Sequence, residues 1–99
     1  MVREHRSERG IKDSIQAIEK GDEVVYEAGS WRRKQPLRVA KKQRIEGYGV
    51  SHDEIAVRAM SSGGKKYSLR APLDRETPPY DKEYGEITWL KVYEGGKGR

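Results

Sequence analysis

Alternation between apolar and polar positions, repeated on either side of a glycine turn, is the feature that most limits how this chain can fold. Residues 55–60 and 67–71 each alternate with the period of two that an extended strand shows. Ser61-Ser62-Gly63-Gly64 separates the two runs and supplies residues that suit a tight turn. The sequence therefore predicts a β-hairpin over residues 55–71. Its shared apolar faces are Ile55, Val57 and Ala59 in the first run, and Tyr67, Leu69 and Ala71 in the second.

Three further runs show the same period and predict strands. Val24 and Tyr26 share one face of a short strand that ends at the turn of residues 28–30. A second strand starts after Pro36, which is tolerated at the beginning of a strand, and carries Leu37, Val39 and Lys41 on one face. The last strand covers residues 86–93. We expect one of its faces to carry Ile87, Trp89, Lys91 and Tyr93, and the other to carry Thr88, Leu90 and Val92.

The N-terminal part of the chain has a helical period instead. Ile11, Ile15 and Ile18 are spaced so that they share one face of a short helix over residues 11–19, and Gly21 is a plausible stop. Residues 1–10 carry mixed charges and predict a frayed arm. Residues 72–84 hold three prolines and predict an irregular crossing, and residues 95–99 predict a flexible tail.

One helix and five short strands in a chain of 99 residues predict one small domain over residues 11–94. A strongly bent sheet that closes on itself hides its edges and buries the most surface per residue. We therefore expect a mainly β fold, a small five-stranded barrel of SH3-like type with a short N-terminal helix. Its predicted core is Ile15, Ile18, Val24, Val39, Ile55, Val57, Leu69 and Leu90.

Gly21-Asp22-Glu23-Val24 at the start of the first predicted strand resembles the Gly-Asp-x-Val opening of many SH3-like barrels, including the KOW domains of ribosomal proteins and transcription factors. The resemblance covers residues 21–71 and implies a barrel whose loops bind RNA, DNA or another protein. The chain also resembles small uncharacterised proteins of archaea and their viruses in the order of four features. These are the Gly-Asp-x-Val opening, Pro-Leu-x-Val, a Gly-Gly hairpin and a closing Ile-x-Trp-Leu. That second similarity implies no activity.

A concentrated positive charge indicates which class of partner the chain binds. Residues 32–44 hold seven basic residues and no acidic one, in a chain whose formal net charge is +5. Such a surface favours a polyanion, and aromatic residues beside it suit base stacking. We expect DNA or RNA to be bound through the phosphate backbone with weak sequence preference. The predicted nucleic-acid-binding residues are Trp31, Arg32, Arg33, Lys34, Arg38, Lys41, Lys42, Arg44, Tyr48, Lys65 and Lys66.

Two alternatives remain open for these residues. Lys and Arg also protect the edges of sheets, so the basic run is equally typical of a solvated strand face. A lone tryptophan such as Trp31 is usually a core residue. The alternative for the chain as a whole is a protein-interaction or assembly module, for example a component of a virus particle, with residues 80–84 as its interface.

Catalytic chemistry has little support in the sequence. His52 lies beside Asp53, but a metal site needs three or four converging ligands. Ser51, His52 and Asp53 are sequence neighbours, which does not supply the geometry of a catalytic triad. We therefore expect no enzyme activity, no catalytic residue, no metal and no cofactor.

The expected location follows from composition. The chain has no cysteine, whereas small secreted domains often depend on disulfides. Residues 1–10 lack the apolar centre of a signal peptide, and no apolar run approaches the ~20 residues that cross a bilayer. We expect a cytoplasmic protein, or one packed into a virion inside the cell, with no membrane partner.

Overall fold

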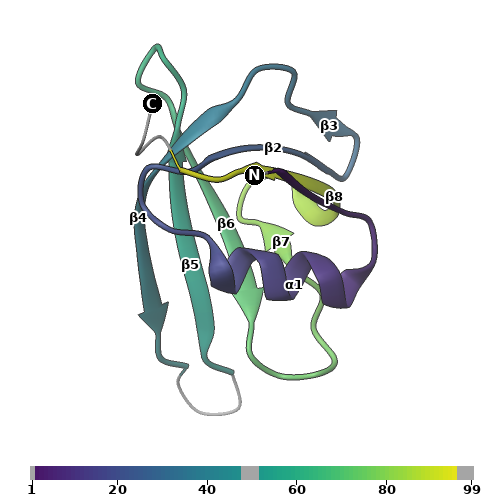
Figure 1. Cartoon of the computed structure of the whole chain (residues 1–99). Coiled ribbons are helices and arrows are strands. Elements are labelled where there is room, and N and C mark those ends of the chain that lie inside the picture. The colour runs from purple at the N-terminus through teal and green to yellow at the C-terminus, as the bar shows by residue number, and fades with distance from the viewer. Residues whose placement is uncertain (1, 48–51, 96–99) are drawn as a thin grey trace.

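The computed structural model describes residues 2–47 and 52–95 as a mainly β molecule with one helix (Figure 1). Within these residues the chain forms eight strands, which belong to a single antiparallel sheet. The elements in order are β1 (Val2–His5), α1 (Glu8–Ala17), β2 (Glu23–Ala28), β3 (Trp31–Arg32), β4 (Leu37–Ile45), β5 (Glu54–Met60), β6 (Lys66–Pro72), β7 (Tyr80–Asp81) and β8 (Gly85–Tyr93).

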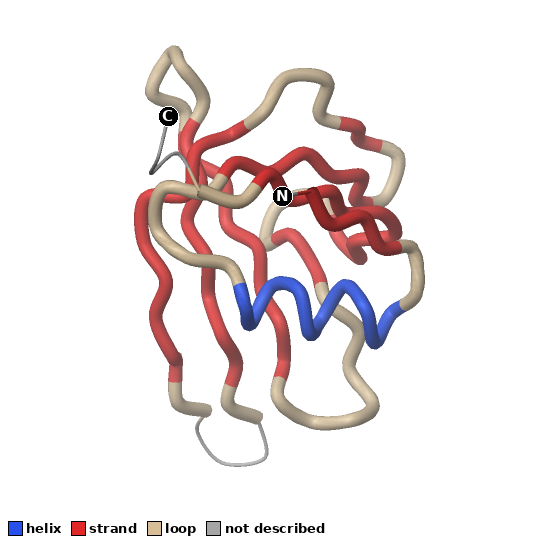
Figure 2. The backbone as a smooth tube through the Cα atoms, in the orientation of Figure 1, coloured by secondary structure: helices blue, strands red, loops and turns tan. Residues whose placement is uncertain are grey.

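Six strands close into a barrel in the order β2–β8–β7–β6–β5–β4. β2 completes the ring because it pairs with β8 along one edge and, through Val24 and Leu37, with β4 along the other. β1 and β3 are additions to this ring. β1 extends the ladder of β8, and β3 folds back on the C-terminal end of β2 (Figure 2).

The five predicted strands correspond to β2, β4, β5, β6 and β8, and the predicted hairpin is the β5–β6 pair. The prediction missed β1, β3 and β7. β3 and β7 hold two residues each, which is too short for an alternation to be visible. β1 was expected to be part of a frayed arm, but it pairs residue by residue with β8 from Val2–Tyr93 to His5–Leu90. A charged segment can form a strand when a neighbouring edge supplies its hydrogen bonds.

α1 begins at Glu8, earlier than the predicted start at residue 11. Ser7 is its N-cap, and the Ser7 hydroxyl accepts a hydrogen bond from the Gly10 amide at 3.0 Å. The isoleucine stripe is confirmed, because Ile11, Ile15 and Ile18 have no exposed surface. Since an isolated helix of this length is marginal in water, packing of this stripe on β6 and β8 holds it in place (Figure 1).

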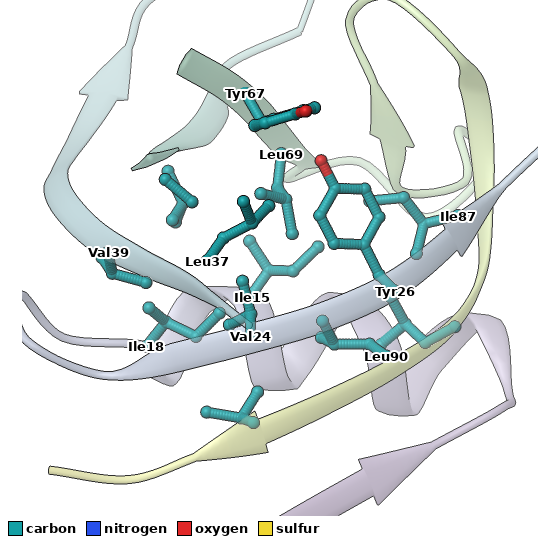
Figure 3. Close-up of a cluster of buried hydrophobic side chains, with 14 of the residues drawn as sticks. Ile15, Ile18, Val24, Tyr26, Leu37, Val39, Tyr67, Leu69, Ile87 and Leu90 are labelled. Atoms are coloured by element: carbon teal, nitrogen blue, oxygen red, sulfur yellow. The ribbon is translucent and has the colours of Figure 1, made fainter. Parts of the chain in front are cut away.

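The core lies inside the barrel and under α1 (Figure 3). Seven of the eight predicted core residues are almost fully buried, and Ile55 is half-buried at its margin. Each fully buried aliphatic side chain contributes about 1.5–3 kcal/mol relative to an exposed one. Tyr26 and Ile87 are core members that the sequence did not single out.

Two β-bulges change which side chains face outwards. The register of β4 against β5 shifts between Val39 and Lys41, which leaves Ala40 as an extra residue. Because cross-strand partners share a face, Lys41 points outwards with Arg58, and the predicted common face of Leu37, Val39 and Lys41 is wrong.

The second bulge affects β8. Its register against β2 shifts so that Trp89 pairs with Glu27, whereas Ile87 pairs with Ala28. Ile87 therefore lies in the core and does not share the outer face with Trp89, Lys91 and Tyr93, as the simple alternation predicted.

Candidate nucleic-acid interface

The seven basic residues between positions 32 and 44 do not share one surface. Arg32, Arg33 and Lys34 surround β3 and the start of the following loop. Arg38 and Lys41 lie on the outer face of β4. Because of the bulge at Ala40, Lys42 and Arg44 pair with Val57 and Ile55 and lie on the opposite face of β4 from Arg38. The segment is therefore three separate groups of charge.

The first group opens onto a hollow outside the β2–β8 ladder. The register places Val25 opposite Lys91, and Glu23 opposite Tyr93. The N-terminal part of the β3–β4 segment overhangs this ladder and encloses about 380 Å³. We call this site the β3 hollow. Its lining residues are Val25, Arg32, Arg33, Lys34, Pro36, Trp89, Lys91 and Tyr93.

Aromatic rings hold the cations of the β3 hollow in place. The guanidinium carbon of Arg32 lies 5.5 Å from the centre of the Trp89 ring, and that of Arg6 lies 5.9 Å from it. The Lys91 ammonium is 5.3 Å from the centre of the Tyr93 ring. Trp89 is itself anchored, because its indole N–H donates to Glu4 Oε2 at 2.8 Å. Trp89 is 8% exposed, so it supports the guanidinium groups and offers little ring surface of its own.

The charge of the β3 hollow is partly compensated from outside its lining, because Glu4 is the cross-strand partner of Lys91 and Glu27 pairs with Arg32. Its lining includes four cations and no carboxylate. Arg32 is 3.9 Å from Glu27, a long and exposed ion pair of the kind that contributes little. Among the described residues, Lys34 and Lys91 make no ion pair. A polyanion entering the hollow would therefore displace few existing contacts.

Trp31 lies in a different environment. Its ring stacks on Tyr84, contacts Tyr67 at a centroid distance of 5.4 Å and Tyr26 at 5.2 Å, and packs against the core. The sequence predicts that Trp31 either stacks on a base or belongs to the core. The structure places it at the margin of the core, where tyrosines occupy its faces.

Two cations cover this aromatic group. The Arg33 guanidinium carbon and the Lys65 ammonium lie 5.7 Å and 5.3 Å from the centre of the Tyr67 ring. Lys65 also donates to the Tyr84 hydroxyl at 3.5 Å, and this hydrogen bond raises the pKa of Lys65. Arg33 therefore connects the β3 hollow to the hairpin tip that carries Lys65.

Other predicted binding residues serve the protein's own structure. The Lys42 ammonium donates to the Gln16 carbonyl near the end of α1 at 2.7 Å. Arg44 donates to Asp53 Oδ2 at 2.6 Å, and this contact, together with the Gly47 amide, lowers the pKa of Asp53. Lys66 is exposed at the start of β6. Tyr48, the second predicted stacking residue, lies outside the described residues.

Sequence reasoning did not assign Trp89, Lys91 and Tyr93 to the binding site. The period-two pattern of the last strand had placed these three on one face. Only the pairing of β2 with both β8 and β3 brings that face next to Arg32 and Lys34.

The tyrosines of residues 80–84 are engaged inside the molecule. The Tyr80 hydroxyl donates to the Glu54 carboxylate, 2.6 Å from Oε2. Partial burial and this hydrogen bond raise the pKa of Tyr80 to about 12. Tyr84 stacks on Trp31. The protein-interface alternative therefore has few free aromatic groups in this segment.

Neither His52 nor the hollow beside Glu19 and Asp22 offers a comparable site. His52 Nδ1 lies 3.4 Å from Asp74 Oδ2, and the described residues contain no cluster of three His, Cys, Asp or Glu placed to hold a metal. This hollow, of about 700 Å³, has mixed charge because Glu19 and Asp22 line it together with Lys20 and Arg38.

The chain matches no protein-family model, no curated protein and no solved structure. Its function must therefore be inferred from its own side chains. Within residues 2–47 and 52–95, no helix has the length and apolar character needed to cross a membrane.

Proposed function

We propose that the protein is a non-catalytic nucleic-acid-binding domain that takes the phosphate backbone of DNA or RNA into the β3 hollow. The observation that carries this proposal is the convergence of four cations, from β3, its following loop and β8, on a hollow whose lining holds no carboxylate. Phosphate contacts supply most of the affinity of sequence-independent binding.

The side chains that line the β3 hollow have different roles in this proposal. Arg32, Lys34 and Lys91 bind phosphate oxygens, and Arg33 extends the positive surface towards Lys65. Tyr93, which is half-buried at the edge of the hollow, offers a ring on which a base can stack. Since this lining is dominated by charge, we expect weak sequence preference.

We also propose that the barrel is a six-stranded variant of the SH3-like type, with the Gly21-Asp22 opening in its usual structural role. Gly21 has a φ of 98°, which favours glycine. Asp22 is buried, and its carboxylate accepts hydrogen bonds from the amides of Glu19 and Gly95 at 3.0 and 2.8 Å. Asp22 thus joins the end of the helical segment to the end of the last strand.

The test is a fluorescence-anisotropy titration with labelled duplex DNA and single-stranded RNA at several salt concentrations. Three phosphate contacts, from Arg32, Lys34 and Lys91, predict a slope of log affinity against log salt of about −2.7 on duplex DNA. Arg32→Glu/Lys34→Glu should lower the affinity at least tenfold and make the slope shallower by about 1.8.

The matched control is Lys20→Glu/Arg75→Glu, which makes the same change in net charge. Both control residues are exposed, lie outside the β3 hollow and form no ion pair with a described residue. The control should retain nearly the wild-type affinity. Failure of the wild-type protein to bind either nucleic acid at low salt would overturn the proposal and leave the protein-interaction alternative.

A further inference from the structure

A second cationic surface covers the outer face of the neighbouring strands β4, β5 and β6, here called the β5 wall. Cross-strand pairing aligns Lys41, Arg58 and Ser68 in one row, and Gln43, Ala56 and Arg70 in the next. These six residues line a shallow depression of about 40 Å³. Arg38 and Lys66 flank it, since both are paired with Met60 at the end of the wall.

The charges on the β5 wall repel one another. Lys41 and Arg58 are direct cross-strand partners, and like charges in this position destabilise a sheet. Among the described residues, neither side chain has a hydrogen bond or an ion pair. An anion placed between them would remove this repulsion, so the pair binds phosphate more favourably than two isolated cations would.

The third cation of the β5 wall is held in a fixed orientation. Arg70 Nε donates to the Ser68 hydroxyl at 3.1 Å, and its Nη1 lies 3.6 Å from Glu54 Oε1. Glu54 is buried and also accepts the Tyr80 hydroxyl. At the other end of the wall, Glu23 is the cross-strand partner of Arg38. The middle of the wall, at Lys41 and Arg58, therefore remains positive.

The β5 wall and the β3 hollow lie on opposite sides of the barrel. In the closed ring, β5 is three strands away from β8 in either direction, through β6 and β7 or through β4 and β2. Figure 1 shows β4 and β5 on one side and β2, β8 and β3 on the other. The molecule measures 43 × 26 × 25 Å along its principal axes. Duplex DNA has a persistence length of about 50 nm, so one short duplex cannot bend around the barrel to reach both surfaces.

We propose that a single molecule bridges two nucleic-acid duplexes, one in the β3 hollow and one on the β5 wall. This inference depends on the proposed function for the β3 hollow and adds a second binding surface with a distinct consequence. The protein then gathers or condenses duplexes, in addition to coating them.

The experiment mixes two short DNA duplexes, one labelled with a donor dye and one with an acceptor, and measures energy transfer as protein is added. Bridging predicts a signal that rises to a maximum near one protein per two duplexes. The signal then falls in excess protein, because each duplex acquires its own molecule. Sedimentation of the protein alone checks that it is a monomer at these concentrations.

Two double variants separate the surfaces. Lys41→Glu/Arg58→Glu should keep anisotropy-detected binding within about threefold of wild type through the β3 hollow, but lose at least nine-tenths of the energy transfer. Arg32→Glu/Lys34→Glu should also lose energy transfer while it keeps weak binding through the wall. Lys41→Gln/Arg58→Gln removes the same two charges without placing two carboxylates opposite each other, and it should also lose energy transfer. Lys20→Glu/Arg75→Glu is the control that should bridge normally.

The outcomes distinguish this inference from the proposed function. Wild-type binding without energy transfer at any ratio would overturn bridging and leave the proposed function intact. Normal energy transfer by Lys41→Glu/Arg58→Glu would also overturn it, since protein dimers would then be the bridge. Absence of any binding by the wild-type protein would overturn both proposals.

Discussion

Trp31 and Tyr84 stack with their ring centroids 4.4 Å apart and their planes 2° apart. Trp31 belongs to β3, and Tyr84 lies in the turn between β7 and β8. The stack therefore joins the short strand that carries Arg32 to the turn between β7 and β8. Since β3 has only two residues, this contact, more than its hydrogen bonds, fixes its position.

Replacement of Trp31 by alanine should consequently destabilise the protein. We expect Trp31→Ala to lower the free energy of unfolding by about 3 kcal/mol, at the low end for large aromatic residues because Trp31 is only half-buried. Trp31→Phe should cost about half as much, since it keeps a ring against Tyr84. Urea denaturation followed by circular dichroism measures both. A loss below about 0.5 kcal/mol for the alanine variant would show that the stack is not structural.

The hydrogen bond between Tyr26 and Asp81 provides a second test. The buried Tyr26 hydroxyl lies 2.5 Å from Asp81 Oδ2, and burial raises the pKa of Tyr26 far above its usual range. Asp81 Oδ1 also accepts the amides of Glu83 and Tyr84, so this carboxylate organises the turn before β8. Tyr26→Phe should lower the free energy of unfolding by about 1.5–3 kcal/mol, because a buried carboxylate loses a donor.

Tyr67→Phe is the matched control for this prediction. Tyr67 is similarly buried, but its hydroxyl makes no hydrogen bond to a described residue. The control should therefore change the free energy of unfolding by no more than about 0.5 kcal/mol. Equal effects of the two substitutions in chemical denaturation would contradict a special role for the Asp81 contact.

Gly29 and Gly64 form a pair that separates backbone strain from steric conflict. Both have positive φ, 58° and 89°, so alanine at either position costs about 1 kcal/mol. A Cβ at Gly29 would also lie 2.5 Å from the Tyr84 carbonyl oxygen, whereas one at Gly64 would meet nothing within 4 Å. Gly29→Ala should therefore destabilise the protein by a further 1–3 kcal/mol or so. Thermal unfolding of the two variants measures the difference, and equal values would rule out the close approach.

Part of this fold could be predicted from sequence because the longer strands carry their own pattern. β5 and β6 alternate over seven residues each and are joined by a Gly-Gly turn, so local information was sufficient. β1 and β3 have no such pattern, and they exist because β8 and β2 offer free edges to pair with. These partners are set by the closure of the barrel, which a local period does not encode.

The candidate site was only partly predictable for a similar reason. Arg32 and Lys34 are close in sequence and were found together. Lys42 is also close in sequence, but the extra residue Ala40 places it on the opposite face of β4 from Arg38. Lys91 is distant in sequence and reaches the hollow through the β2–β8 register. A single inserted residue in a strand therefore decides whether neighbouring charges act together.

The ion pair between Arg44 and Asp53 predicts a specific acid dependence. Its hydrogen bond lowers the pKa of Asp53 in the folded state below the value of about 3.9 expected when unfolded. A lowered carboxylate pKa contributes stability that is fully present above the unfolded pKa and is lost as the pH falls through the folded pKa. Arg44→Gln should therefore shrink the fall in melting temperature between pH 5 and pH 2.5.

Above pH 5, the difference in melting temperature between the wild type and Arg44→Gln should not change with pH, because the Asp53 carboxylate is ionised in both the folded and the unfolded chain. Asp53→Asn provides the complementary variant, because it removes the titrating group itself. If both variants lose melting temperature on acidification as steeply as the wild type does, Asp53 makes no contribution to the acid transition.

The final prediction distinguishes the three-dimensional hollow from the linear basic segment. Lys91 lies in the β3 hollow but outside residues 32–44, whereas Lys42 lies inside that segment but donates to Gln16 on the other side of the barrel wall. Lys91→Gln should weaken duplex binding several-fold and make the salt slope shallower by about 0.9. Lys42→Gln, with the same change in charge, should leave both quantities nearly unchanged. Anisotropy titrations at four salt concentrations measure both slopes. The opposite ranking would mean that the chain's local charge density, and not the convergence of β3 with β8, attracts the nucleic acid.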